Sequence, residues 1–267
     1  QLSGQIIGGL VQTKYAKGFG DLYLSMQRGK FGLDAQYKLV NGNSYGESSR
    51  IANHPLGNNR IHYNDETGQK SFGITHNYRL GMNYTFSKNN RLDVAYTGQW
   101  DKTNSNSRTT GSSISGMHRD SHEYLHNVDV NYALPFGLTL SGSYTYYCTL
   151  QQQALDGTMH TDESMPETER NLTSGSEQTI NKWMFTADQT HSLANCWGLS
   201  YGVKGQFTSN KSYQTTIDKD GSVLPDGTSS VDLNERIWNI YAGFSKQINK
   251  AISLEASVAA EQYHSPI

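Results

Sequence analysis

The sequence predicts an all-β protein, an antiparallel transmembrane β-barrel in which about eleven long strands follow one another as a meander. Three observations lead to this prediction. Side-chain polarity alternates with a period of two, the alternating stretches are long, and their connections alternate between short turns and long polar loops. The composition agrees, because 35% of the 267 residues are hydrophobic whereas aromatic residues reach 11%, with 17 tyrosines. Such a chain has too few aliphatic side chains for a large soluble core and too many aromatic ones for a disordered chain.

The alternating stretches define the predicted strands in order. They comprise residues 5–14, 20–28, 31–42, 72–86, 90–102, 120–134, 137–150, 179–192, 197–211, 233–247 and 251–263. In residues 78–86, for example, Leu80 and Met82 share one face. Arg79 and Asn83 share the opposite face. Many of these stretches exceed the five or six residues that are usual in globular sheets, and about ten residues tilted at about 45° match the thickness of a bilayer.

The connections between the predicted strands segregate by length. Every second connection is a tight turn, at residues 28–30, 87–90, 134–136, 193–196 and 248–251. The others after the first are long polar loops, at residues 43–71, 103–119, 151–178 and 212–232. Short turns at one end and long loops at the other are typical of barrels in the outer membrane of Gram-negative cells, with turns in the periplasm and loops outside. A soluble β-sandwich is the alternative, and it gives no reason for this regular segregation.

Charge, hydropathy and cysteine content exclude several other classes. The net charge of -2 provides no basic surface for nucleic acid. The sequence contains no run of 18 apolar residues that could form a transmembrane helix. The two cysteines are too few for a disulfide framework. Cys148 is expected at the outer end of its strand and Cys196 in a periplasmic turn, so we expect no disulfide between them.

One stretch matches a catalytic motif, the HEYLH of residues 122–126, which has the H-E-x-x-H spacing of zinc metalloproteases. That motif works on a helix, where His122 and His126 would lie on one face and Glu123 would act as a base. The alternation of the residues that follow, up to Pro135, predicts a strand instead. On a strand the two histidines are about 13 Å apart, too far for two bonds of about 2.0–2.1 Å to one zinc ion.

Two weaker metal patterns are also present. His118 extends the motif to H-x3-H-x3-H, which scattered polar residues on a loop and a strand end explain equally. The DG pairs in residues 218–221 and 225–227 resemble parts of a calcium loop but lack its full ligand spacing, and DG is first of all a turn sequence. We therefore predict no catalytic residue, no cofactor and no metal; His122 and His126 are the residues to test for metal binding.

Several segments resemble an outer-membrane β-barrel family of Bacteroidota, whose members are similar to TonB-dependent receptors. The opening segment, residues 4–47, contains TKYAKG, LYLSMQRGKFGL and AQYKL, which are similar to the first hairpins of that barrel. Residues 197–212, WGLSYGVKGQFTSNKS, look like a strand from the middle of it. Residues 236–263, with a tight INKA turn, resemble a later strand pair.

The resemblance implies an outer-membrane location and import of a bulky nutrient. Full members of the larger group carry a plug domain before a barrel of 22 strands, which is the part that engages the TonB system. Here no plug sequence precedes residue 4, the strand count is odd, and the C-terminal YHSPI lacks a terminal aromatic residue. We therefore expect residues 1–267 to be one partial barrel domain with two open sheet edges, which favour pairing with strands of another molecule.

The functional hypothesis is a non-catalytic part of a TonB-dependent-receptor-like transporter for an unknown nutrient. It would contact the lipid bilayer and lipopolysaccharide, and its lumen and outer loops would contact the nutrient. The alternative is a surface adhesin or interaction protein that uses its long extracellular loops. A hydrolase embedded in a barrel is a third class, but no spacing in the sequence supports a Ser or His nucleophile system.

Overall fold

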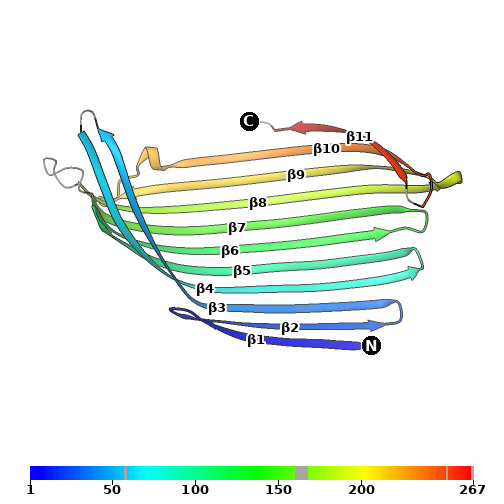
Figure 1. Ribbon diagram of the computed structural model, residues 1–267, viewed down its shortest axis with the longest axis horizontal. Helices are drawn as coiled ribbons and strands as arrows, with labels where there is room; N and C mark the ends of the chain where they lie inside the picture. The colour runs from blue at the N-terminus through cyan, green and yellow to red at the C-terminus, as the bar shows by residue number, and fades with distance from the viewer. Residues whose placement is uncertain (57–58, 160–167, 251, 266–267) are drawn as a thin grey trace.

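The computed structural model describes residues 1–56, 59–159, 168–250 and 252–265. Its strands form a single antiparallel sheet of 11 strands in sequence order (Figure 1), so the predicted meander is confirmed. The strands are β1 (Leu2–Gln12), β2 (Ala16–Arg28), β3 (Phe31–Leu56), β4 (Asn59–Ser87), β5 (Asn90–Gly111), β6 (Ser113–Ala133), β7 (Leu138–Met159), β8 (Thr168–Leu193), β9 (Trp197–Asp218), β10 (Ser229–Gln247) and β11 (Ser253–His264). Two short 3-10 turns, η1 (Ala194–Cys196) and η2 (Pro225–Gly227), interrupt the connections. Within the described ranges no helix is long and apolar enough to cross a membrane.

The short turns lie where the sequence predicts them, between β2 and β3, β4 and β5, β6 and β7, β8 and β9, and β10 and β11. Three of them use the left-handed backbone region. Gly29 has a φ of 59° in the first, Gly137 has a φ of 86° in the third, and Asn195 has a φ of 58° in η1. Glycine and asparagine are the residues that adopt this conformation at least cost. The local sequence therefore fixes where one end of the sheet reverses direction.

The prediction that the long polar segments are loops is wrong for most of their residues, which extend the neighbouring strands. Residues 43–71 lie almost entirely in β3 and β4, which stay paired out to Leu56 and Asn59. Residues 103–119 likewise extend β5 and β6, which pair as far as Thr109 and Ser115. Residues 151–178 extend β7 and β8, and within them residues 160–167 lie outside the described residues. Residues 212–232 are the exception in part, since 212–218 and 229–232 extend β9 and β10 whereas 219–228 form a connecting loop that contains η2. These segments are polar on both faces, so their backbones can pair while their side chains give no alternating pattern.

Strand register places side chains of like polarity next to one another across the sheet. Met82 lies opposite Leu33 of β3 and Val94 of β5, and Val94 lies opposite Val130 of β6. We call the side that carries Leu80, Met82 and these partners the outer face. The side that carries residues such as Arg79 is called the inner face. The prediction that the alternating segments have one apolar face is thereby confirmed for β3 to β6.

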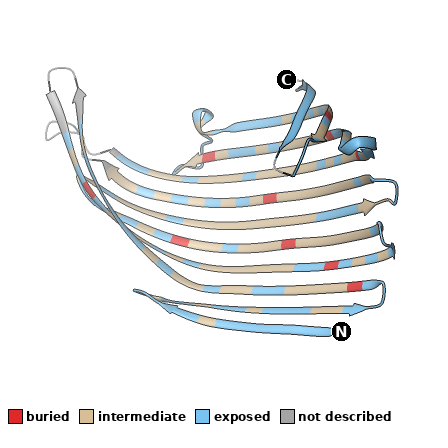
Figure 2. Ribbon diagram, turned by 45° about the vertical axis from the view of Figure 1, so that its right-hand side comes forward, coloured by how far each residue is buried: buried red, intermediate tan, exposed pale blue. Residues whose placement is uncertain are grey.

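The sheet is one layer and has no core between layers. Cys148, which is 7% exposed, is the one buried hydrophobic side chain among the described residues. Almost the whole sheet is intermediate or exposed (Figure 2). Large apolar side chains of the outer face remain exposed, including Leu80 at 52% and Met82 at 45%. An apolar surface of this extent requires cover by a partner or by lipid. Within the described residues no hydrogen-bonded ladder joins β1 to β11, so these two strands are the edges of the sheet.

Candidate functional site

The outer face changes character along each strand. In β5 it is apolar from Leu92 to Trp100, and then continues as Lys102, Asn104 and Asn106. The row through Trp100 continues in register across the neighbouring strands as Tyr124, Cys148 and Thr179. We call the part of the outer face between the short turns and this row the belt. Its extent in β5 agrees with the about 9–11 residues that a tilted strand needs to cross a bilayer.

Aromatic side chains border the belt at both ends. At the turn end, Tyr84 and Phe86 meet edge to face with ring centroids 4.7 Å apart. At the other end, the ring of Trp100 lies against that of His76 with centroids 4.9 Å apart, and Tyr124 lies opposite Trp100 on β6. Two aromatic rows that flank an apolar band are the arrangement of side chains found at the two interfaces of a membrane.

Three histidines of the belt, in β4, β6 and β8, each have a tyrosine hydroxyl as hydrogen-bond partner. The hydroxyl of Tyr37 is 2.6 Å from Nδ1 of His76. The hydroxyl of Tyr96 is 2.7 Å from Nδ1 of His126, whose ring also stacks between Tyr96 and Tyr146. His191 and Tyr201 form the third pair, at 3.1 Å. Because an imidazole in an apolar environment needs a hydrogen-bond partner, these pairs explain how histidine is tolerated there.

The HEYLH segment lies inside β6, so the prediction that it is a strand is confirmed. His122 lies opposite Lys102 and Leu150, whereas His126 lies opposite Gly98 and Tyr146. Both histidines are on the outer face, and Glu123 is on the inner face. Across the described part of the chain, no group of three or more His, Cys, Asp or Glu side chains could hold a metal ion. The geometry of a zinc protease is therefore not formed by these residues.

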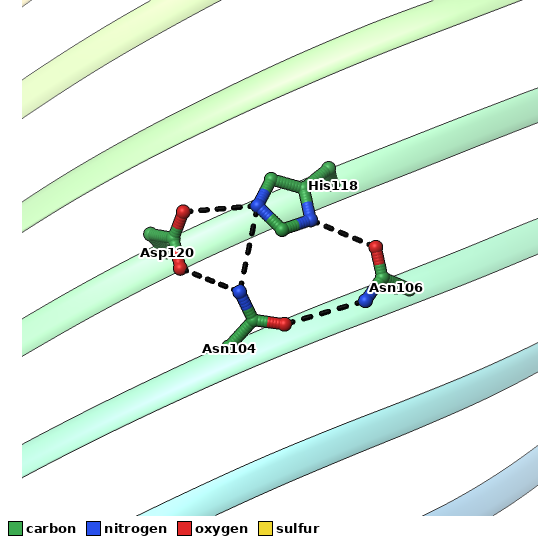
Figure 3. Close-up of polar contacts among 4 residues, drawn as sticks. All are labelled: Asn104, Asn106, His118 and Asp120. Carbon is green, nitrogen blue, oxygen red and sulfur yellow. Dashed lines mark hydrogen bonds and ion pairs between the residues drawn. The ribbon is translucent and has the colours of Figure 1, made fainter.

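His118, the third histidine of the series, belongs to a polar network outside the belt (Figure 3). Its Nε2 is 2.9 Å from Asp120 and its Nδ1 is 2.7 Å from Oδ1 of Asn106. Asn104 donates to the other oxygen of Asp120 at 2.7 Å. The bond from Asn104, followed by that from His118, holds the pKa of the Asp120 carboxyl below its ordinary value of 3.8. This network could not be predicted from the sequence, because both asparagines fall in the segment predicted to be a loop.

The inner face is mostly polar and charged, although it also carries apolar side chains such as Leu125 and Ile180. Arg79 pairs with Asp34 at 3.2 Å, and Arg91 pairs with Asp93 at 2.6 Å. Further inner-face charges are Asp21, Lys38, Asp129, Lys182, Asp188 and Lys204. Acidic and basic groups are thus mixed, and hydrogen bonds such as that from Ser141 to Asn131 link neighbouring strands.

Cys148 and Cys196 are both free. Cys148 does not lie at the end of its strand as predicted, since β7 continues to Met159. The first of the two DG segments is a turn, as predicted, because the amide of Gly221 donates to the carbonyl of Asp218 at 2.9 Å. The second forms η2.

Residues 137–266 match the model of the outer membrane protein beta-barrel family. No curated protein sequence matches the chain. Among solved structures, it is similar to the ferric citrate transporter FecA in its unliganded form, with 11% identity and a TM-score of 0.36 over 92% of this chain and 44% of that one. It is also similar to the ferric yersiniabactin uptake receptor FyuA from Yersinia pestis, with 12% identity and a TM-score of 0.36 over 99% of this chain and 51% of that one. A third similar structure is the siderophore receptor PiuA from Acinetobacter baumannii, with 10% identity and a TM-score of 0.37 over 96% of this chain and 48% of that one. The chain therefore spans about half the length of these structures.

The sheet, its belt and the family match together define the class of the protein. It is an antiparallel outer-membrane β-barrel protein, located in the outer membrane of a Gram-negative cell. The outer face meets lipid across the belt, and the inner face lines the lumen. The parts of β3 to β10 that continue beyond the belt, here called the outer hairpins, extend toward the outside of the cell.

Proposed function

We propose that the chain is part of the wall of a TonB-dependent-receptor-like transporter that imports a bulky nutrient and performs no catalysis. The observation that carries the proposal is the inner face, on which charged and polar side chains predominate from the short turns to the outer hairpins. Its paired charges, such as Arg79 with Asp34, keep that surface hydrated without a large net charge of either sign. A continuous hydrated wall supports the passage of a polar solute.

In this proposal, residues 1–267 are one partial barrel domain. A plug and further strands would come from chain outside these residues, and the TonB system would act through that plug. The edges β1 and β11 expose backbone N–H and C=O groups, which would pair with those further strands or with strands of another molecule. The lipid bilayer and lipopolysaccharide are the surroundings of the belt, and nucleic acid is not a partner. His122 and His126 bind no metal in this proposal.

The test compares cells with and without the full-length gene in a complex medium. Mass spectrometry of the medium follows which solutes each strain removes, with and without a protonophore. The expected result is at least one solute above the size that general porins pass, removed by the parent strain alone and only while the proton gradient is intact. If both strains deplete the medium identically, the transporter proposal is wrong.

The outer hairpins support a second candidate, a surface adhesin. β3 and β4 remain paired out to Leu56 and Asn59, well beyond the belt, and so offer an extended polar surface to the exterior. Shortening this hairpin on both strands should abolish attachment to a host surface if the protein is an adhesin. Attachment that survives the deletion, with solute uptake lost, would favour the transporter.

A further inference from the structure

A groove of about 750 Å³ crosses the outer face directly beyond the belt. Its middle is a row of side chains in register across five consecutive strands, β5 to β9. The row consists of Lys102, His122, Leu150, Glu177 and Tyr213. The adjacent row toward the short turns is the aromatic border through Trp100 and Tyr124. Because this face meets lipid, the groove opens toward the headgroup layer of the outer leaflet and not into the lumen.

Three polar side chains of the groove are unpaired within the described residues. Lys102, His122 and Glu177 form no hydrogen bond or ion pair with any other described residue, and the charge of Lys102 acts on Asp120 only at longer range. Asp120, which also lines the groove, differs because Asn104 and His118 already occupy its oxygens. A concavity that combines apolar lining, such as Leu150 and Tyr213, with a few convergent polar groups is typical of a ligand site.

We propose that this groove binds the sugar headgroup of an outer-leaflet glycolipid. Tyr213 is 53% exposed and offers an aromatic ring against which a sugar ring can stack, while a hydrogen bond from the Thr215 hydroxyl orients its phenol. Glu177 accepts hydrogen bonds from sugar hydroxyls. Lys102 and His122 lie side by side on paired strands and can contact an acidic substituent of the sugar.

The mixture of chemical groups favours a lipid-linked sugar over the other occupants. Leu150 is 39% exposed in the centre of the row, and the belt begins one row below it, so an attached acyl chain would continue onto apolar surface. A site for a free anion would need more cations than Lys102 and His122, and Glu177 would oppose it. The inference rests on the outer-membrane location and not on the identity of any transported nutrient.

The floor of the groove offers a clean way to close it. Gly175 lies on the outer face between Gln152 and Thr215, and a Cβ added there meets nothing within 4 Å. Gly175→Leu therefore fills the groove without straining the strand. Gly46→Leu is the matched control, since a Cβ at Gly46 also meets nothing within 4 Å and this residue lies on the inner face of another outer hairpin.

The experiment measures the glycolipid retained per molecule of full-length protein purified from outer membranes in mild detergent, by mass spectrometry. We expect Gly175→Leu to lower retention about tenfold, equivalent to about 1.4 kcal/mol of binding free energy, and Gly46→Leu to leave it unchanged. Lys102→Ala and Glu177→Gln should each lower it by a smaller factor. Circular dichroism of each variant confirms that the sheet is folded.

Competition with the delipidated oligosaccharide of the same glycolipid identifies the source of the sugar. Weak displacement by the free sugar supports the proposal, because the acyl chain then contributes to binding. Displacement at equimolar concentration would overturn it in favour of a soluble sugar. Equal retention by wild type and Gly175→Leu would also overturn it, as would a crosslink from Tyr213 to another protein in intact membranes.

Discussion

Each of the strands β4 to β9 has two regions, one in the belt and one in an outer hairpin, that share one hydrogen-bonded ladder but differ in what surrounds them. In β7, the belt region presents Leu140 and Tyr144 to lipid, whereas the hairpin region presents Gln152 and Asp156 to water on the same face. The backbone is extended and paired in both regions. The backbone hydrogen bonds between strands therefore form with or without an apolar face. The position of the sheet in the membrane, in contrast, depends on where the apolar face begins and ends.

The two regions also satisfy polar side chains by different means. In the belt, the imidazole of His126 has one tyrosine hydroxyl as its hydrogen-bond partner. In the outer hairpins, His118, Asp120 and Asn104 share several bonds in an open network that water also reaches. A lost bond in the belt therefore leaves a polar atom in lipid, while a lost bond in a hairpin is replaced by water.

The largest expected effect comes from adding one charged side chain to the outer face, either in the belt or in an outer hairpin. Val128→Arg places a guanidinium on the lipid side of β6 in the middle row of the belt and should lower the free energy of unfolding by about 2–4 kcal/mol. Ala154→Arg places the same group on the same face of the neighbouring strand β7, but in the outer hairpin, and should change it by less than about 0.5 kcal/mol. Denaturant titration of full-length protein folded into lipid vesicles measures both. Equal losses from the two variants would show that β6 does not cross the membrane at Val128.

A smaller effect is expected from the tyrosine–histidine pairs. Tyr96→Phe removes the hydroxyl that satisfies His126 and should cost about 1–3 kcal/mol, because the imidazole remains in an apolar environment. The double variant Tyr96→Phe with His126→Phe removes both polar groups and should recover most of the loss. Denaturant titration of the wild type, the two single variants and the double variant completes this double-mutant cycle. Additive losses in the double variant would mean that the hydroxyl and the imidazole act independently.

The belt half of each strand could be predicted from the sequence, and the hairpin half could not. Leu80 and Met82 alternate with Arg79 and Asn83 because lipid on one side and water on the other impose a period of two. Beyond the belt, water surrounds both faces, so nothing in the side chains distinguishes a paired strand from a loop. The tight turns were predictable for another reason, since residues such as Gly29 report a backbone conformation directly.

The candidate sites follow the same division. His122 and His126 could be separated from zinc chemistry on the sequence alone, because the alternation that continues to Ala133 predicts a strand. The groove could not be predicted, because its row joins Lys102, Glu177 and other side chains that are far apart in the chain. Only the register of five strands brings them together. Register in the outer hairpins depends on the turns and on the ladder already set in the belt, and not on a local pattern.

The smallest expected effect concerns pH and should be confined to one outer hairpin. The pKa of Asp120 is lower in the folded protein than its ordinary value of 3.8, first because Asn104 donates a hydrogen bond to it and then because His118 does. A lowered folded pKa means that the carboxylate contributes stability in full above pH 3.8, and that this contribution is lost as the pH falls through the folded value. Acidification to about pH 3 should therefore speed amide hydrogen exchange in β5 and β6 around Asp120.

Asp120→Asn is the matched control for this effect, because it keeps the shape of the side chain and removes the titrating group. The hairpin of this variant should exchange at the same rate above and below pH 3.8, after correction for the intrinsic pH dependence of exchange. Amides of the belt, such as those between Val128 and Tyr132, should stay protected in both proteins. Acid-induced exposure that begins in the belt would contradict the division of each strand, because the pH-sensitive carboxylate of Asp120 would then support the membrane-spanning region as well.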